Sequence, residues 1–124
     1  MRILAALFGL SVLIAGCGTF VTDTPINPPP RPVSPRGYGS VAVFSSAPPT
    51  RSHVDVALIE VEQTHDLNTQ GTDLMIQRLR ERAGALGCDA VVIGGMRERG
   101  RDVHGFDSGS TTLHATCIVY DDRR

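Results

Sequence analysis

The chain has 124 residues, 41% of them hydrophobic, which suits a single small domain with its own core. Its twelve basic residues, all arginine, are opposed by thirteen acidic ones, which leaves a formal charge of −1 at pH 7. This balance and the absence of tryptophan argue against a surface that binds nucleic acid.

The first segment, residues 1–16, is predicted to be a signal peptide. Arg2 precedes an uncharged, largely apolar run over residues 3–15, which is too short to span a bilayer as an ordinary helix. The run ends in Ile14-Ala15-Gly16-Cys17, which resembles the lipobox of bacterial lipoproteins. The resemblance implies cleavage before Cys17 and a diacylglycerol, with palmitate-type acyl chains, on its thiol. An ordinary secretory signal with a chance cysteine is the alternative.

The lipobox implies attachment to a membrane, and Gly18, rather than aspartate, follows the cysteine. By the sorting rule of enterobacteria this favours the cell outer membrane. We expect a domain that faces the periplasm rather than the cell exterior. Because the chain is weakly acidic, acyl chains rather than anionic head groups must hold it to the membrane.

Residues 17–39 are predicted to form a proline-rich tether that carries the lipidated cysteine. Six prolines fall between positions 25 and 35, and few large apolar side chains lie among them. Such a composition favours an extended, polyproline-like path and no packed core. A tether of about twenty residues would lift the domain up to ~60 Å from the membrane.

The folded domain is expected to span residues 40–122. Residues 41–44 form a short predicted strand, and residues 54–62 form a second one after a proline-containing loop. Within the second strand Val54, Val56 and Leu58 alternate in one register, whereas Ile59 and Val61 occupy the other. This break in phase predicts a β-bulge.

A helix over residues 72–86 is the central prediction for the domain. Thr72 is a candidate cap and Gly87 a candidate left-handed end. The apolar face is predicted to consist of Met75, Ile76, Leu79, Ala83 and Leu86, and the outer face of Gln77, Arg80, Glu81 and Gly84.

A buried strand over residues 89–94, a long polar loop over 95–111 and a strand over 113–120 complete the domain. In the last strand Leu113, Ala115, Cys117 and Val119 alternate with residues of the other face. The order β-β-α-β-β predicts an α+β two-layer sandwich, with one helix packed on a small, mostly antiparallel sheet. The uncovered face must be polar, wrapped by the tether or used in self-association, so a homo-oligomer stays open.

Several segments resemble the YbjQ-like domains. Val41-Ala42-Val43 and residues 56–61 are similar to the opening strands of that family, and Leu86-Gly87-Cys88-Asp89-Ala90-Val91-Val92 is similar to its helix–strand signature. The family implies a small α/β fold and includes domains described as heavy-metal binders. The outer-membrane lipoprotein that senses stress for the Rcs phosphorelay has a related domain and a similar lipid–spacer–domain layout.

Cys88 and Cys117 are predicted to form a disulfide in an oxidising compartment. If residues 89–94 pair antiparallel with 112–119, opposite residues have numbers that sum to about 206, and this pair sums to 205. Two buried thiols that serve only to pack the core are the alternative.

The sequence predicts no catalytic residue, no metal site and no cofactor. Asp89 opens the buried strand, but a carboxylate after a helix more often accepts backbone N–H groups nearby. The most plausible partner-binding segment is the long loop, with candidate residues Arg97, Arg99, Arg101, His104 and Phe106. We therefore expect a lipid-anchored, non-catalytic module that binds an envelope protein or senses stress. The alternative function is periplasmic binding of a heavy metal.

Overall fold

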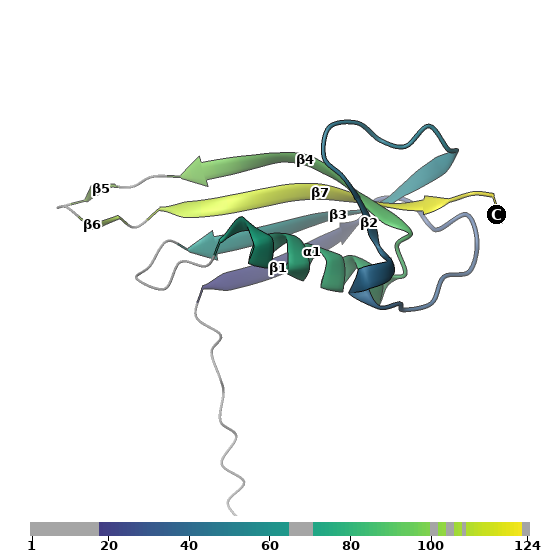
Figure 1. Cartoon of the computed structure of the whole chain (residues 1–124), viewed down its shortest axis with the longest axis horizontal. Coiled ribbons are helices and arrows are strands. Elements are labelled where there is room, and N and C mark those ends of the chain that lie inside the picture. The colour runs from purple at the N-terminus through teal and green to yellow at the C-terminus, as the bar shows by residue number, and fades with distance from the viewer. Residues whose placement is uncertain (1–17, 65–70, 100–101, 104–105, 108, 123–124) are drawn as a thin grey trace, which may run out of the picture.

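The computed structural model describes residues 18–64, 71–99, 102–103, 106–107 and 109–122. In these ranges one helix packs against one face of a five-stranded mixed sheet (Figure 1), so the predicted α+β class is confirmed. The main elements are β1 (Thr19–Pro25), β2 (Ala42–Phe44), β3 (His53–Thr64), α1 (Thr72–Leu86), β4 (Ala90–Arg99) and β7 (Ser110–Tyr120). Three short elements complete the chain: the 3-10 helix η1 (Tyr38–Ser40), β5 (Asp102–Val103) and β6 (Phe106–Asp107).

The strand order in the sheet is β1-β3-β7-β4-β2. The β1–β3, β3–β7 and β7–β4 pairs are antiparallel, and the short β2 lies parallel to the start of β4. The long strands β3 and β7 occupy the middle, where a strand forms ladders on both sides. The apolar side chains of their helix face meet α1 and form the core, which includes Ile59, Val61, Leu79, Leu113, Cys117 and Val119.

The predicted β-bulge in the second strand is confirmed. The register between β3 and β7 shifts between Asp55 and Ala57, so Val56 has no opposite residue there. Beyond the bulge, Ile59 and Val61 point into the core while Leu58 is 48% exposed. Because the bulge adds one residue, the alternation of inward and outward side chains changes phase there. Apolar residues before the bulge and Ile59 and Val61 after it can therefore both face the core.

The helix α1 has the predicted bounds and core face, with Met75, Leu79 and Ala83 buried. Gly87 ends it in the left-handed conformation at φ 80°, as predicted. The predicted cap is wrong, because the residue at the N-cap is Gly71, which has no side chain with which to cap the first turn.

The prediction that the domain begins near residue 40, after an extended tether, is wrong for residues 19–39. Thr19–Pro25 is strand β1, paired with β3 from Thr19 opposite Gln63 to Pro25 opposite Ala57. An edge strand is held largely by main-chain hydrogen bonds, so it does not need many large apolar side chains. Residues 1–17, which include the predicted signal peptide and Cys17, lie outside the described residues.

The segment between β1 and β2 packs on the outer side of α1. The Arg36 N–H donates a hydrogen bond to the Gly84 carbonyl at 2.8 Å, and Gly84 is buried. A Cβ at position 84 would overlap the carbonyl oxygen of Arg36. The assignment of Gly84 to the solvent side of the helix is therefore wrong, because the proline-rich segment covers it.

The prediction of a long loop over residues 95–111 is also wrong. Strand β4 runs to Arg99, and β7 starts at Ser110, directly opposite it. Beyond this pair β5 and β6 pair with each other, so β4 and β7 continue as a two-stranded arm that extends past the helix (Figure 1). The polar, glycine-containing composition suits a solvated hairpin as well as a loop, which is why composition alone did not separate the two.

The predicted disulfide between Cys88 and Cys117 is present, with the Cα atoms 5.7 Å apart. The assumed register was wrong, because opposite residues of β4 and β7 have numbers that sum to 208, as in Val91 and Cys117. Cys88 lies in the turn before β4 and reaches Cys117 from there. A ring of about thirty residues closed in this way contributes roughly 3–4 kcal/mol in the chain-entropy model.

Candidate functional site

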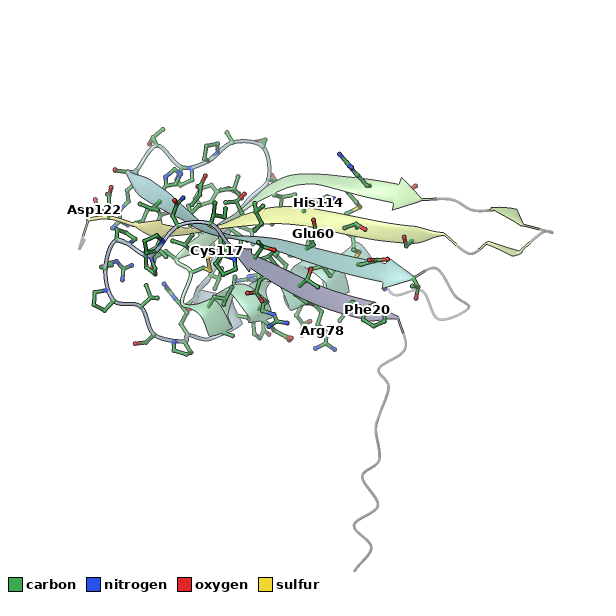
Figure 2. The ribbon with its side chains drawn as sticks, turned by 180° about the vertical axis from the view of Figure 1, so that it is seen from behind. Phe20, Glu60, Arg78, His114, Cys117 and Asp122 are labelled. Atoms are coloured by element: carbon green, nitrogen blue, oxygen red, sulfur yellow. A yellow bond between two sulfur atoms is a disulfide. The ribbon has the colours of Figure 1, made fainter. Side chains whose placement is uncertain are left out.

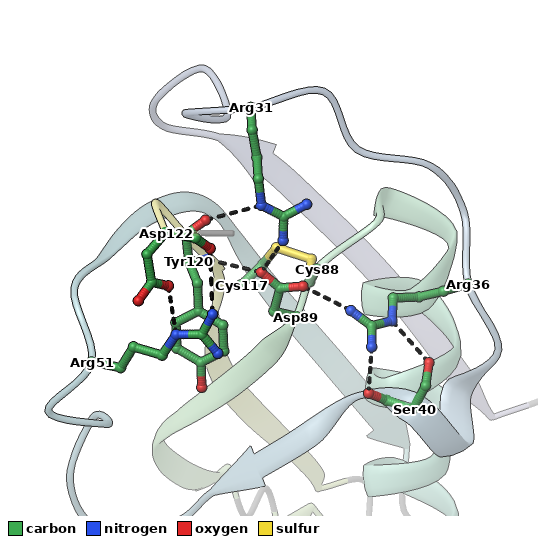
Figure 3. Close-up of polar contacts among 9 residues, drawn as sticks. All are labelled: Arg31, Arg36, Ser40, Arg51, Cys88, Asp89, Cys117, Tyr120 and Asp122. Atoms are coloured by element: carbon green, nitrogen blue, oxygen red, sulfur yellow. Dashed lines mark hydrogen bonds and ion pairs between the residues drawn. A yellow bond between two sulfur atoms is a disulfide. The ribbon is translucent and has the colours of Figure 1, made fainter. Parts of the chain in front are cut away.

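Two surfaces of the described structure gather polar side chains, and the first is a cluster around Asp89 (Figure 3). Asp89 accepts hydrogen bonds from Arg31 at 2.5 Å, from Arg36 at 2.7 Å and from the Tyr120 N–H at 2.8 Å. Its side chain is only 10% exposed. We expected this carboxylate to accept hydrogen bonds from backbone N–H groups nearby in the sequence. That expectation is wrong, because all three donors lie far away in the sequence.

The arginines of this cluster make further hydrogen bonds. Arg31 Nε donates to the Tyr120 carbonyl at 3.1 Å, while Arg36 also donates to the hydroxyl and carbonyl of Ser40, at 2.8 and 3.0 Å. Arg51 pairs with Asp122 at 2.6 Å and lies 4.1 Å from the ring centroid of Tyr120.

A hollow of about 570 Å³ lies among these side chains. Its three guanidinium groups face the carboxylates of Asp89 and Asp122, and Asp121 lies next in the chain. Each guanidinium is therefore already paired with a carboxylate, and an anionic ligand would have to compete with these ion pairs. This cluster, which we term the Asp89 clamp, ties the segment after β1 to the start of β4 and the end of β7.

The second surface is the face of the sheet opposite α1, which we term the open face. Phe20 of β1 and Leu58 of β3 point from it and are 57% and 48% exposed. Glu60 and His114 lie side by side on β3 and β7 (Figure 2), with Glu60 Oε1 3.2 Å from His114 Nδ1. Alternation places all four residues here, because their neighbours in sequence point into the core.

A shallow groove of about 500 Å³ crosses the open face above Gly94 and Gly95. The missing side chains of this glycine pair leave the space, and the β4–β7 register shifts at the same point. Leu58 supplies an apolar wall, and Glu60, Arg97 and His114 supply charged or polar ones. A smaller hollow along the same strands continues the groove past Glu62, Ser110 and Thr112.

His114 carries an unusual feature for a surface histidine. Its Nδ1 faces Glu60, whereas its Nε2 is shielded from solvent and has no hydrogen-bond partner among the described residues. The Glu60 carboxylate thus holds one side of the imidazole, while the nitrogen on the other side is buried and unpaired within this part of the chain. Sequence reasoning placed His114 on the outward face but did not pair it with Glu60.

The sequence-predicted partner residues fall in different parts of the arm. Arg97 lies on β4 and lines the groove. The backbone of Arg99 belongs to β4 and that of Phe106 to β6, while their side chains, Arg101 and His104 lie outside the described residues. The alternation of Leu58, Glu60 and Glu62 with Ile59 and Val61 was the signal that could have identified the groove.

In the described part of the chain, no three His, Cys, Asp or Glu side chains converge in a way that could hold a metal ion. Cys88 and Cys117 are joined to each other, so neither offers a thiolate. Nor does any described helix have the length and apolar character needed to cross a bilayer.

Comparisons with known proteins bear on the fold. No family model and no curated protein matches the chain. Among solved structures, the crystal structure of the Francisella virulence factor FvfA, in its orthorhombic form, superposes with a TM-score of 0.56. The match covers 84% of this chain and 99% of FvfA at 14% identity. A likeness at this identity shows a shared fold and leaves the function to the surfaces described above.

Proposed function

We propose that the chain is an outer-membrane lipoprotein, acylated at Cys17, whose open face binds a protein partner of the cell envelope. The observation that carries the proposal is the groove above Gly94 and Gly95, where the exposed Leu58 lies beside Glu60, His114 and Arg97. A surface of mixed apolar and charged side chains on a rigid sheet is typical of protein recognition. The lipobox at residues 14–17 supports the anchor.

The rest of the molecule supports a binding role rather than a catalytic one. The other face of the sheet is covered by α1, and the polar cluster at Asp89 is engaged in holding the chain together. The disulfide suits an oxidising compartment such as the periplasm. A domain built in this way offers a stable sheet whose open face can differ in its side chains without loss of the core.

The test is site-specific photocrosslinking in intact envelopes. A photoreactive phenylalanine analogue at Leu58 should capture a discrete protein, whereas the same analogue at Gln77, exposed on the helix, should not. A captured species of twice the chain's own mass would identify a second copy as the partner. Capture of the same proteins from both positions, or none from Leu58, would contradict the proposal.

The anchor is tested separately by replacing Cys17 with Ser. The variant should leave the membrane fraction or remain unprocessed, and its crosslink through Leu58 should weaken because the protein is no longer held near its partner. Normal processing with unchanged membrane association would contradict lipidation at this residue.

A further inference from the structure

Strand β1 begins two residues after Cys17, so no spacer separates the predicted lipid from the sheet. Consecutive Cα atoms are about 3.8 Å apart, so Thr19 lies within ~8 Å and Phe20 within ~11 Å of the Cys17 Cα. A tether of the length expected from composition would have allowed up to ~60 Å. Because the first strand begins so close to Cys17, the domain can lie only a short distance above any membrane that holds this residue.

The start of β1 is firmly attached to the domain. The Thr64 N–H donates to the Gly18 carbonyl at 2.9 Å, and the β1–β3 ladder runs from Thr19 onward. On the outer edge, Arg82 of α1 donates to the Val21 carbonyl at 3.1 Å and pairs with Asp23 at 3.3 Å. The strand is therefore held from both sides and is poorly suited to act as a spacer by detaching.

The most exposed large apolar side chain among the described residues lies at this same end. Phe20 is 57% exposed, and its strand partner is Glu62 on β3. In Figure 2 Phe20 lies at the opposite end of the five-stranded sheet from Asp122. An aromatic ring three residues from an acyl anchor is placed to contact the interfacial layer, which is about 5–8 Å thick on each side of the hydrocarbon.

We propose that the start of β1, at the edge of the sheet, rests on the lipid surface, with Phe20 in the head-group layer. This inference depends on the proposed lipidation of Cys17. Glu62 beside the ring limits the depth, because a carboxylate strongly resists transfer into hydrocarbon. The contact therefore adds a second, weaker membrane attachment to that of the acyl chains and turns the β1 edge of the sheet toward the membrane.

The absence of tryptophan makes a direct measurement feasible. Phe20→Trp and Tyr120→Trp each give a full-length protein with a single indole. The two positions lie about 30 Å apart along the strands, because Phe20 is opposite Glu62 and Tyr120 is opposite His53. Tyr120→Trp keeps an aromatic ring beneath Arg51, so both variants should fold, which near-UV circular dichroism checks.

Each lipidated variant would be reconstituted into phosphatidylcholine vesicles that carry bromine atoms on the acyl chains close to the head group. Bromine quenches tryptophan at contact range, so we expect about twofold or more stronger quenching at position 20 than at position 120. Flotation with the vesicles and the mass of the N-terminal peptide report independently on the acyl anchor.

These measurements distinguish failure of the inference from failure of the anchor. If the protein floats and is acylated but Phe20→Trp is not quenched, or both positions are quenched equally, the proposed contact is wrong while the anchor stands. If Cys17 carries no acyl group and the protein does not float, the anchor itself is wrong and the contact falls with it.

Discussion

The same strands form both faces of the sheet, but the two faces have different roles. On the helix face Ile59 and Val61 are fully buried against α1. On the open face their neighbours Leu58 and Glu60 are exposed to solvent. Because these residues alternate along one strand, the difference lies in the side chains and in what covers them. The helix face should therefore determine stability and the open face recognition, so substitutions can separate the two.

The path of the segment after β1 supports this separation of roles between the two faces. Instead of wrapping the open face, the chain after β1 crosses the end of the sheet and packs on the outer side of α1. The Asp89 clamp holds it there through Arg31 and Arg36. Ordering this proline-rich segment costs less entropy than ordering an average one, because each proline already has a fixed φ. The groove is thereby left uncovered by this part of the chain.

The largest effect is expected from Leu79→Ala, which removes a fully buried side chain beneath the sheet. We expect it to lower the free energy of unfolding by about 2–5 kcal/mol. The control is Leu58→Ala, the same chemical change on the open face, which should cost less than about 1 kcal/mol. Urea unfolding of the two variants measures both. Equal midpoints would mean that the open face is covered in solution.

Gly84→Ala is expected to change the free energy of unfolding by a smaller amount, and the direction of the change is informative. In a solvent-exposed helix this change stabilises by about 0.5–1 kcal/mol. Here the added Cβ would overlap the Arg36 carbonyl, so we expect destabilisation by about 1–3 kcal/mol. Gly39→Ala is the control, since nothing lies within 4 Å of its added Cβ. Stabilisation by Gly84→Ala in thermal or urea unfolding would show that the segment does not pack on the helix.

Local patterns in the sequence predicted the elements whose neighbours are close in the chain. The period of Met75, Leu79 and Ala83 located the helix, and the glycine at 87 located its end. The phase change between Leu58 and Ile59 indicated the bulge that the structure places at Val56. The disulfide was predicted correctly from a register that was off by two, because Cys88 reaches across from a turn rather than from the strand itself.

What the sequence did not predict depends on contacts between distant segments. The prolines at 25–35 obscured the strand signal of Thr19, Phe20, Val21 and Thr22, which are β-branched or aromatic residues. Gly84 is buried because Arg36 packs against it. The ion pairs of Asp89 likewise need Arg36 and Arg31, which precede it by 53 and 58 residues. The open-face groove likewise needs the β3–β7–β4 register: the local alternation along β3 indicates an outward face, but not which strands lie beside it.

The smallest effect is expected on the solvent side of α1, a third surface that belongs to neither face of the sheet. The Gln77 amide donates to the Glu81 carboxylate at 3.0 Å, and this hydrogen bond, followed by the nearby Arg78, lowers the pKa of Glu81 below its usual value. A lowered pKa in the folded state means that the contact stabilises the protein above the unfolded-state pKa. That contribution is lost as the pH falls through the folded-state pKa.

Gln77→Ala should therefore raise the pKa of Glu81 toward its usual value, which NMR titration of the side-chain carboxyl measures. The cost in stability at neutral pH should be a few tenths of a kcal/mol, about 0.2–0.5, because the pair is exposed and joins residues one helical turn apart. Arg78→Ala is the matched comparison and should also raise the pKa, because it removes a hydrogen bond and a positive charge from the same carboxylate. A larger rise in the pKa of Glu81 from Arg78→Ala than from Gln77→Ala would mean that charge, rather than the amide hydrogen bond, governs this carboxylate. A large loss of stability from Gln77→Ala would mean that the outer side of the helix is packed against another part of the protein. Stability would then depend on this third surface as well as on the helix face of the sheet.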